Sequence, residues 1–128
     1  MTIKNFKGRI LFVNPDLETQ EMVALIVKDA GYEIISALNI GEGLALVNQA
    51  NFDLILLDWF FEDGHGIDLC RQIRTQDQHT PIFFYASEGR QSEIKKAINA
   101  GAQGFFLKPV AVDHFLTTLS EYLERRII

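Results

Sequence analysis

Residues 54–58 read Leu-Ile-Leu-Leu-Asp, four apolar side chains followed directly by a carboxylate. A short, uninterrupted apolar run of this kind is typical of a strand that is buried on both faces of a parallel sheet. The run therefore predicts a strand at 54–57 that places Asp58 at its carboxyl end. Ligands of open α/β sheets gather at the carboxyl ends of the strands. This one stretch thus indicates both a fold class and the place of a site.

Similar apolar runs recur along the chain, and each is followed by an amphipathic stretch. The expected strands are 9–13, 32–37, 54–57, 81–85 and 104–107. The first helix is expected to start with Asn14 as its N-cap and Pro15 in its first turn, and to end at Gly31. Five such βα units predict a three-layer α/β fold, a parallel sheet covered by helices on both faces. The segment 60–66 is expected to be a loop.

Composition restricts the function. The 128 residues are 48% hydrophobic and carry a formal net charge of -5. They predict one domain over residues 8–126 behind an N-terminal extension, residues 1–7. No basic excess favours direct binding to nucleic acid, and no apolar run is long enough for a membrane span. The single cysteine, Cys70, cannot close an intrachain disulfide, which suits a reducing cytoplasm.

Charged side chains stand at two of the expected strand ends. Asp58 follows the third strand, and Lys108 follows the fifth and precedes Pro109. A carboxylate at the end of one buried strand with a lysine at the end of another favours a functional site. The alternative stays open that Asp58 is a structural carboxylate balanced by Lys108 and by backbone donors.

With these motifs the sequence resembles the receiver domain of response regulators in two-component signalling. The resemblance covers almost the whole chain and rests on Ile10–Val13, Asp53–Asp58, Gly66, Pro81, Ala100–Ala102 and Lys108–Pro109. It implies a flavodoxin-like (βα)5 fold with five parallel strands in the order 2-1-3-4-5.

The resemblance also implies roles for individual residues. Asp58 matches the phosphoacceptor, and Lys108 matches the lysine that neutralises the phosphoryl oxygens. Pro109 matches a proline that follows a cis peptide bond. In the family a magnesium ion is held by two acids after the first strand, by the phosphoacceptor, and by a backbone carbonyl two residues later, here that of Phe60.

The sequence departs from the family at the metal site. Asn14 and Pro15 stand where the two acids belong, and Asp16 comes one residue late and is expected to point away along the helix. The remaining candidates for Mg²⁺ are Asn14, Asp16, Asp58 and the Phe60 carbonyl, so the ion is expected to bind weakly or not at all. The sequence implies no other cofactor. Without the cation, Asp58 and Lys108 are expected to form a direct ion pair.

The switch positions depart as well. Ala86 stands where the family has Thr or Ser, with Ser87 next, and Phe105 lacks the hydroxyl of the usual tyrosine. Glu62 replaces a proline in the loop after Asp58, and together with Asp63 it is expected to place negative charge near the site. Phosphorylation and its coupling to the switch are therefore expected to be impaired.

The leading hypothesis is an atypical receiver, not an enzyme, that acts as a protein-interaction module. A histidine kinase or a downstream signalling protein is its expected partner. The face around Arg90, Lys95, Lys96, Phe105 and the helix that starts near Val112 is expected to mediate docking or a homodimer. One alternative is a conventional receiver phosphorylated on Asp58 with a weak Mg²⁺ site. A second is a small flavodoxin-like enzyme or cofactor carrier.

Overall fold

The computed structural model describes residues 6–87 and 91–124, with Gln91 described by its backbone alone. Its main sheet has five parallel strands in the order β2-β1-β3-β6-β7. These strands are β1 (Arg9–Val13), β2 (Glu33–Ala37), β3 (Leu54–Leu57), β6 (Ile82–Ala86) and β7 (Gly104–Leu107). Because β4 and β5 form a separate small sheet, this is the predicted order 2-1-3-4-5, and the fold-class prediction is confirmed.

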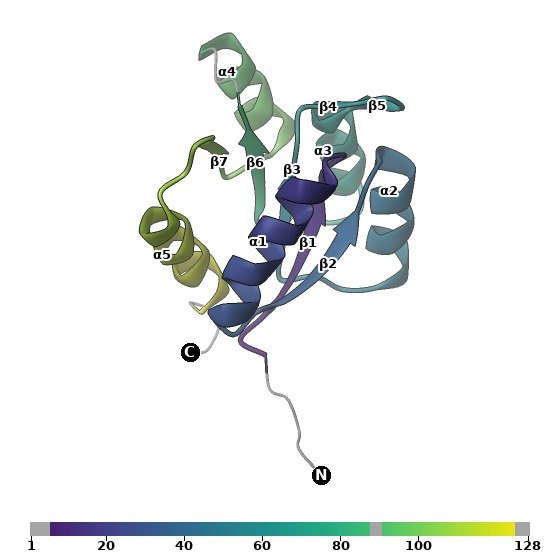
Figure 1. Ribbon diagram of the computed structural model, residues 1–128. Coiled ribbons are helices and arrows are strands. Elements are labelled where there is room, and N and C mark those ends of the chain that lie inside the picture. Colours follow the sequence, from purple (N-terminus) through teal and green to yellow (C-terminus); the bar gives the residue numbers. More distant parts are fainter. Residues whose placement is uncertain (1–5, 88–90, 125–128) are drawn as a thin grey trace.

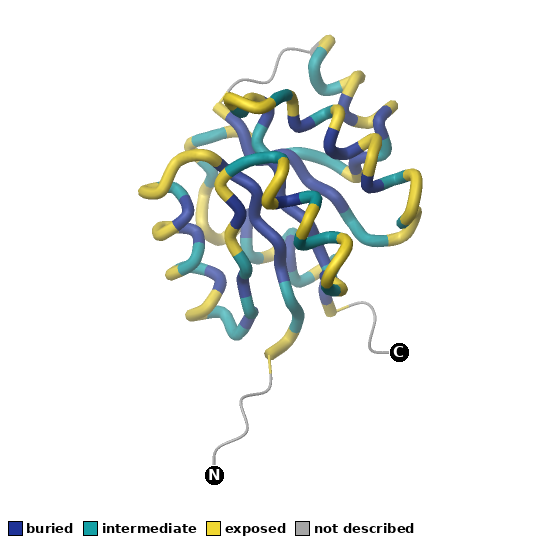
Figure 2. The backbone as a smooth tube through the Cα atoms, turned by 90° about the vertical axis from the view of Figure 1, so that its right-hand side faces the viewer, coloured by how far each residue is buried: buried dark blue, intermediate teal, exposed yellow. Residues whose placement is uncertain are grey.

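Helices cover both faces of the sheet (Figure 1). On one face lie α1 (Leu17–Asp29) and α5 (Val112–Leu123). The other face is covered by α2 (Ile40–Gln49), α3 (Gly66–Arg74) and α4 (Gln91–Ala100). The buried strands run between these layers, and the outer sides of the helices are exposed (Figure 2). Within the described residues, no helix has the length and apolar character that crossing a bilayer requires.

Two separate apolar cores result, one on each face of the sheet. Alternate side chains of the central strands point to opposite faces, so that Leu57 and Phe84 enter one core while Leu56 and Phe83 enter the other. Trp59 stacks on Phe84 in the core beneath α2, α3 and α4, with 4.4 Å between the ring centroids. Continuous apolar strands are therefore necessary here, because both of their faces are buried.

The start of α1 differs from the prediction. Asp16, not Asn14, is the N-cap, since its carboxylate accepts a hydrogen bond from the Thr19 backbone N–H. Asn14 is fully buried and turns its side chain inward, where its Oδ1 atom accepts from the Asp16 N–H at 2.9 Å. Pro15 thus precedes the helix and does not lie in its first turn.

The expected loop at 60–66 contains a hairpin. Two short strands, β4 (Phe60–Phe61) and β5 (Gly64–His65), pair antiparallel. The Asp63 carboxylate between them accepts hydrogen bonds from the backbone N–H groups of Ile40 and Gly41 at the start of α2. These bonds lower the pKa of Asp63, because they favour its charged form. The sequence predicted that the negative charge of Asp63 would lie near Asp58, whereas the Asp63 carboxylate is bonded to the start of α2.

Gly66 allows the hairpin to pass closely over the end of β3. A Cβ atom at this position would lie 1.9 Å from the Asp58 carbonyl oxygen, a backbone atom that cannot move aside. We expect Gly66→Ala to lower the free energy of unfolding by about 3 kcal/mol or more through overpacking. Chemical denaturation followed by Trp59 fluorescence measures the change.

Gly41→Ala is the matched control. A Cβ atom there meets only ordinary contacts, the nearest being Asn39 Oδ1 at 3.4 Å. Gly41 lies in α2, so alanine is expected to raise the free energy of unfolding by up to about 1 kcal/mol through helix propensity. Equal effects of the two alanines would contradict the steric argument.

Candidate functional site

The strand register aligns the candidate residues along one edge of the sheet. Val13 pairs with Leu57, and Ala86 pairs with Leu107, so Asn14, Asp58, Ser87 and Lys108 each follow a strand end at that edge. The edge also contains the point where the order of the strands reverses, between β1 and β3. This is where ligands of doubly wound sheets bind.

Asp58 is partly buried and accepts two hydrogen bonds. Its Oδ1 atom accepts from the backbone N–H of Trp59 at 2.7 Å, and its Oδ2 atom accepts from the Asn14 side-chain amide at 3.3 Å. Burial raises the pKa of Asp58 above its ordinary value. The Trp59 hydrogen bond and the positive charge of Lys108 partly oppose this increase, and the charge of Asp16 adds to it.

Asn14 has a fixed orientation. Its backbone N–H donates to the Ala37 carbonyl, and its own carbonyl accepts from Gln20. Because its Oδ1 atom is already bonded to the Asp16 N–H, its Nδ2 amide is the group that faces Asp58. Where the family has a carboxylate oxygen for a cation, this chain therefore presents an N–H donor.

Asp16 is occupied by helix capping. Its carboxylate accepts from both the backbone N–H and the hydroxyl of Thr19, and these bonds lower its pKa. The expectation that it turns along the helix agrees with this geometry. The Asp16 carboxylate therefore caps the N-terminus of α1, and its negative charge acts on Asp58 only at longer range.

These donors do not fit a tightly held Mg²⁺. In the described part of the chain, no three His, Cys, Asp or Glu side chains converge on a point where a metal ion could sit. Asn14 directs an N–H group at Asp58, and a cation placed there would be repelled by that dipole. The remaining candidate donor, the backbone carbonyl of Phe60, is part of the β4–β5 hairpin, in which Phe60 pairs with His65.

Lys108 does not form the expected ion pair with Asp58. The described residues make three ion pairs, and this is not one of them. Instead the Lys108 ammonium lies over the ring of Tyr85, with Nζ 5.1 Å from the ring centroid. A cation is attracted to the face of an aromatic ring, and Asp58 already has two neutral donors, so the charges remain separated. The Lys108–Pro109 peptide bond is cis.

The switch and interaction positions lie on or next to three elements, β6, β7 and α4. Ala86 is buried at the end of β6, while the next residue, Ser87, is exposed. Phe105 in β7 is half-buried and packs against the core beneath α2, α3 and α4. Lys95 and Lys96 are exposed on α4, where Lys96 Nζ is 3.9 Å from Glu93. Arg90 lies outside the described residues.

Gln20 is a buried polar residue beside the site that the sequence patterns did not indicate. This side chain is 4% exposed, and its Nε2 group donates to the carbonyls of Phe12, Asn14 and Ala37 at 2.9, 3.1 and 3.0 Å. It thereby fastens α1 to the ends of β1 and β2. The buried residues of α1 are Gln20, Val23 and Val27, a spacing of three and four residues that could have identified it.

The comparison with known families identifies the class of protein. The model of the response regulator receiver domain matches residues 10–120. The fold, the strand-end aspartate and the strand-end lysine agree with that match, and the chain belongs to the response regulator receiver domain family.

Individual relatives are distant in sequence and close in structure. The phosphate regulon transcriptional regulatory protein PhoB of Pseudomonas aeruginosa is 30% identical over 119 residues, which are 91% of this chain and 52% of PhoB. Chemotaxis protein CheY-3 of Vibrio cholerae is 26% identical over 126 residues, with 96% and 97% covered. Among solved structures, Vibrio cholerae CheY4 superposes with a TM-score of 0.85 at 29% identity, covering 91% of this chain and 98% of CheY4.

A two-component response regulator from Clostridium difficile superposes with a TM-score of 0.89 at 24% identity, covering 94% of this chain and 98% of that one, a likeness of fold. The chain spans about half the length of several transcriptional regulators it matches. In this chain the receiver domain of two-component signalling covers residues 10–120.

Replacing Gln20 tests its part in holding Asn14. Gln20→Met keeps the length of the side chain but removes the donor to three buried carbonyls, and we expect the free energy of unfolding to fall by about 1–3 kcal/mol. Urea denaturation measures this, and the side-chain amide resonance of Asn14 is expected to shift as well. Gln72→Met, on the exposed side of α3, is the control and is expected to change neither. An unchanged Asn14 resonance in Gln20→Met would contradict the assigned role.

Proposed function

We propose that this domain is an atypical receiver whose conformation is set by its sequence and its partners more than by magnesium-dependent phosphorylation of Asp58. One observation carries the proposal: an amide N–H of Asn14 is directed at Asp58 Oδ2, at 3.3 Å. A neutral donor there stabilises the carboxylate without a cation. Two-component receivers that use phosphorylation need a divalent charge at this point, because the transferred group is highly anionic.

The charges around Asp58 support the same reading. Mg²⁺ releases its hydration water reluctantly and is held in proteins largely by carboxylate oxygens. Two other nearby acids are engaged elsewhere, since Asp16 caps α1 and Asp63 is bonded to the start of α2, whereas Asp58 accepts from Asn14 at the site. Ala86 removes the hydroxyl that would connect an acyl phosphate to the switch, and Phe105 has none to offer.

The competing function is a conventional receiver phosphorylated on Asp58. It is favoured by the proximity of Lys108, whose charge acts on Asp58 to lower its pKa. Asn14, Asp16 and water would then form a weak cation site, and Lys108 would leave Tyr85 to contact the phosphoryl oxygens. The two functions differ in whether Mg²⁺ binds beside Asp58 and supports its phosphorylation.

Trp59 is suited to separate them, because its backbone N–H bonds Asp58 while its ring is buried against Phe84. The experiment titrates Mg²⁺ and then acetyl phosphate, following Trp59 emission, in the natural chain and in an Asn14→Asp, Pro15→Asp double variant. We expect the double variant to bind Mg²⁺ at least about tenfold more tightly, because two carboxylates are returned.

The natural chain is expected to respond little to either addition. Asp58→Asn in the double variant is the control and is expected to abolish the response to acetyl phosphate. Saturable, Asp58-dependent quenching of the natural chain at low millimolar Mg²⁺ would overturn the proposal and establish the conventional receiver.

The proposed partners are proteins, namely a histidine kinase or a downstream signalling protein, met in the cytoplasm. The buried free thiol of Cys70 suits that reducing compartment. The docking face includes α4, β7 and the start of α5. Exposed apolar residues accompany Lys95 and Lys96 there: Ile98, Leu107 and Val112 are each 43% to 47% exposed. Apolar contacts with a charged rim are typical of protein interfaces.

A homodimer is the simplest use of this face, and charge reversal tests it. We expect Lys95→Glu with Lys96→Glu to weaken self-association at least about tenfold, measured by sedimentation equilibrium, because the new carboxylates would repel acidic residues of the second copy, such as Asp113 at the start of α5, that the lysines can attract. Lys28→Glu, on α1, is the control. A natural chain that stays monomeric, or a double variant that dimerises equally well, would contradict the use of this face for dimers.

A further inference from the structure

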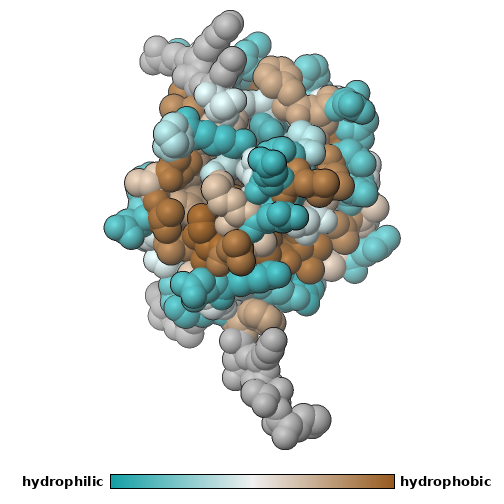
Figure 3. Space-filling model, viewed as in Figure 1, coloured by the Kyte–Doolittle hydropathy of each residue, from teal (hydrophilic) through white to brown (hydrophobic). Residues whose placement is uncertain are grey.

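A groove between α1 and α5 lies outside the site around Asp58. Its volume is about 390 Å³, and it is lined by Met22, Val23, Ile26, Tyr85, Lys108, Pro109, Val110, Val112 and Phe115. Apolar side chains gather on this face of the molecule (Figure 3). Volumes of this size are sufficient for a small ligand, because ligand pockets usually start at about 300 Å³.

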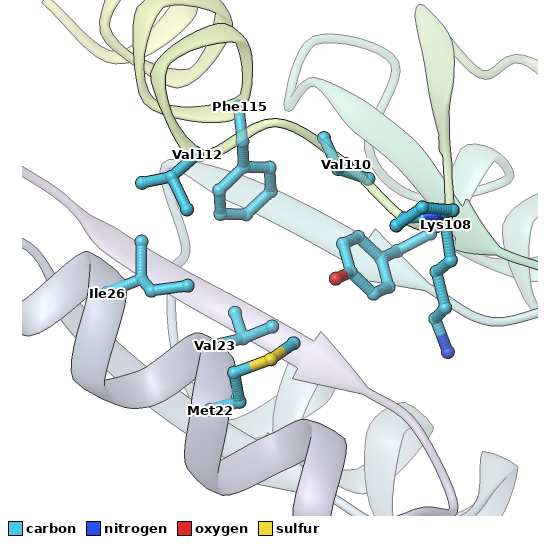
Figure 4. Close-up of a pocket in the computed structure, with 9 residues that line it drawn as sticks. Met22, Val23, Ile26, Lys108, Val110, Val112 and Phe115 are labelled. Atoms are coloured by element: carbon cyan, nitrogen blue, oxygen red, sulfur yellow. The ribbon is translucent and has the colours of Figure 1, made fainter.

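The groove has a floor of buried side chains and a rim of exposed ones. Val23, Tyr85 and Phe115 on the floor are 1%, 5% and 3% exposed, whereas Met22 and Val112 on the rim are 48% and 47% exposed. Figure 4 shows Val23 and Ile26 directed from α1 toward Phe115 and Val112 of α5. The apolar core on this face is therefore not closed between the two helices, and an apolar body could complete it.

Two residues with polar groups line this apolar groove, Lys108 and Tyr85. The Lys108 ammonium lies over the Tyr85 ring, at the end of the groove away from Ile26 (Figure 4). Within the described part of the chain, neither group has a hydrogen-bond partner or an ion pair. Asp58 and Asp16 act on Lys108 only at longer range. A few polar groups beside an apolar cavity fix the orientation of a bound ligand, and a cation among them favours an anionic group.

We propose that this groove binds a small amphipathic carboxylate, with its apolar body between Ile26 and Phe115 and its carboxylate on Lys108 and Tyr85. The charge decides the class of ligand, because a neutral apolar molecule would leave both polar groups unpaired and a cation would be repelled by Lys108. The groove itself is formed without a phosphoryl group on Asp58, and such a group would compete with the ligand for Lys108.

The test uses 3-phenylpropionate, with 3-phenylpropanol and 3-phenylpropylamine as neutral and cationic analogues of the same length. Binding is followed by chemical shifts of the Met22, Ile26 and Val110 methyl groups in the whole chain. We expect saturable binding of the carboxylate with a Kd of about 1 mM, the affinity that a ligand of this size reaches at ordinary efficiency. The alcohol and the amine are expected to bind at least about tenfold more weakly.

Variants identify the groups responsible. Lys108→Met is expected to remove the preference for the carboxylate over the alcohol, and Tyr85→Phe to reduce it. Lys28→Met removes a lysine of α1 outside the groove and is expected to bind as the natural chain does. If Lys108→Met does not fold, Tyr85→Phe and the three analogues still decide the question.

Three results would overturn the proposal: no saturable shift with 3-phenylpropionate, equal binding of the alcohol, or shifts that map away from the groove. If the groove instead binds side chains of a partner protein and no small ligand, 3-phenylpropionate would give no saturable shift. Failure of this test leaves the Mg²⁺ titration of Asp58 unaffected, because that titration uses Trp59, which is buried on the opposite face of the sheet.

Discussion

The hydrogen bond from the Asn14 amide to Asp58 determines the character of the strand-end site. A carboxylate that is partly removed from water must find positive charge or hydrogen-bond donors, because its desolvation is otherwise too costly. Receivers ordinarily place a divalent ion there, whereas this chain supplies the Asn14 amide and the Trp59 N–H. Both donors are held by the fold itself: Gln20 fixes the Asn14 backbone, and Trp59 is fixed by its stack on Phe84. The site is thus satisfied before any ion or phosphoryl group arrives.

The sequence predicted the strands well, because a parallel strand buried on both faces must be apolar throughout, and the resemblance to receiver domains supplied their order. The strands at 9–13, 54–57 and 104–107 have the predicted bounds. Errors occurred where several polar side chains compete for the same backbone groups. Asn14 and Asp16 are both good N-caps, and burial of Asn14 leaves the cap to Asp16. The hairpin at Phe60–His65 has no periodicity of its own. It depends on Asp63 reaching α2, a contact between residues 22 and 23 positions apart that local patterns do not reveal.

The candidate site was predictable in its positions and not in its contacts. Strand-end positions follow from the register, so Asp58 and Lys108 were correctly assigned to one edge of the sheet. A lysine side chain, however, is long enough to choose among several partners. Lys108 lies over Tyr85 because the register of β6 with β7 brings that ring beneath it, and because the Asn14 amide already serves Asp58. Gln20 was missed for a related reason. A glutamine on a helix is usually exposed, whereas here its amide is buried against the carbonyls of Phe12, Asn14 and Ala37 at the strand ends.

Lys108 links the strand-end site around Asp58 with the groove between α1 and α5. Its charge lowers the pKa of Asp58, while its position over Tyr85 opens toward the groove between α1 and α5. One ammonium group cannot approach both places closely at the same time. Whatever draws Lys108 into the groove weakens its support of the ionised Asp58 carboxylate, and whatever draws it toward Asp58 exposes the face of Tyr85. By linkage, the two effects must be equal in free energy. Binding of the proposed carboxylate in the groove and the charge state of Asp58 would therefore be coupled through this one lysine.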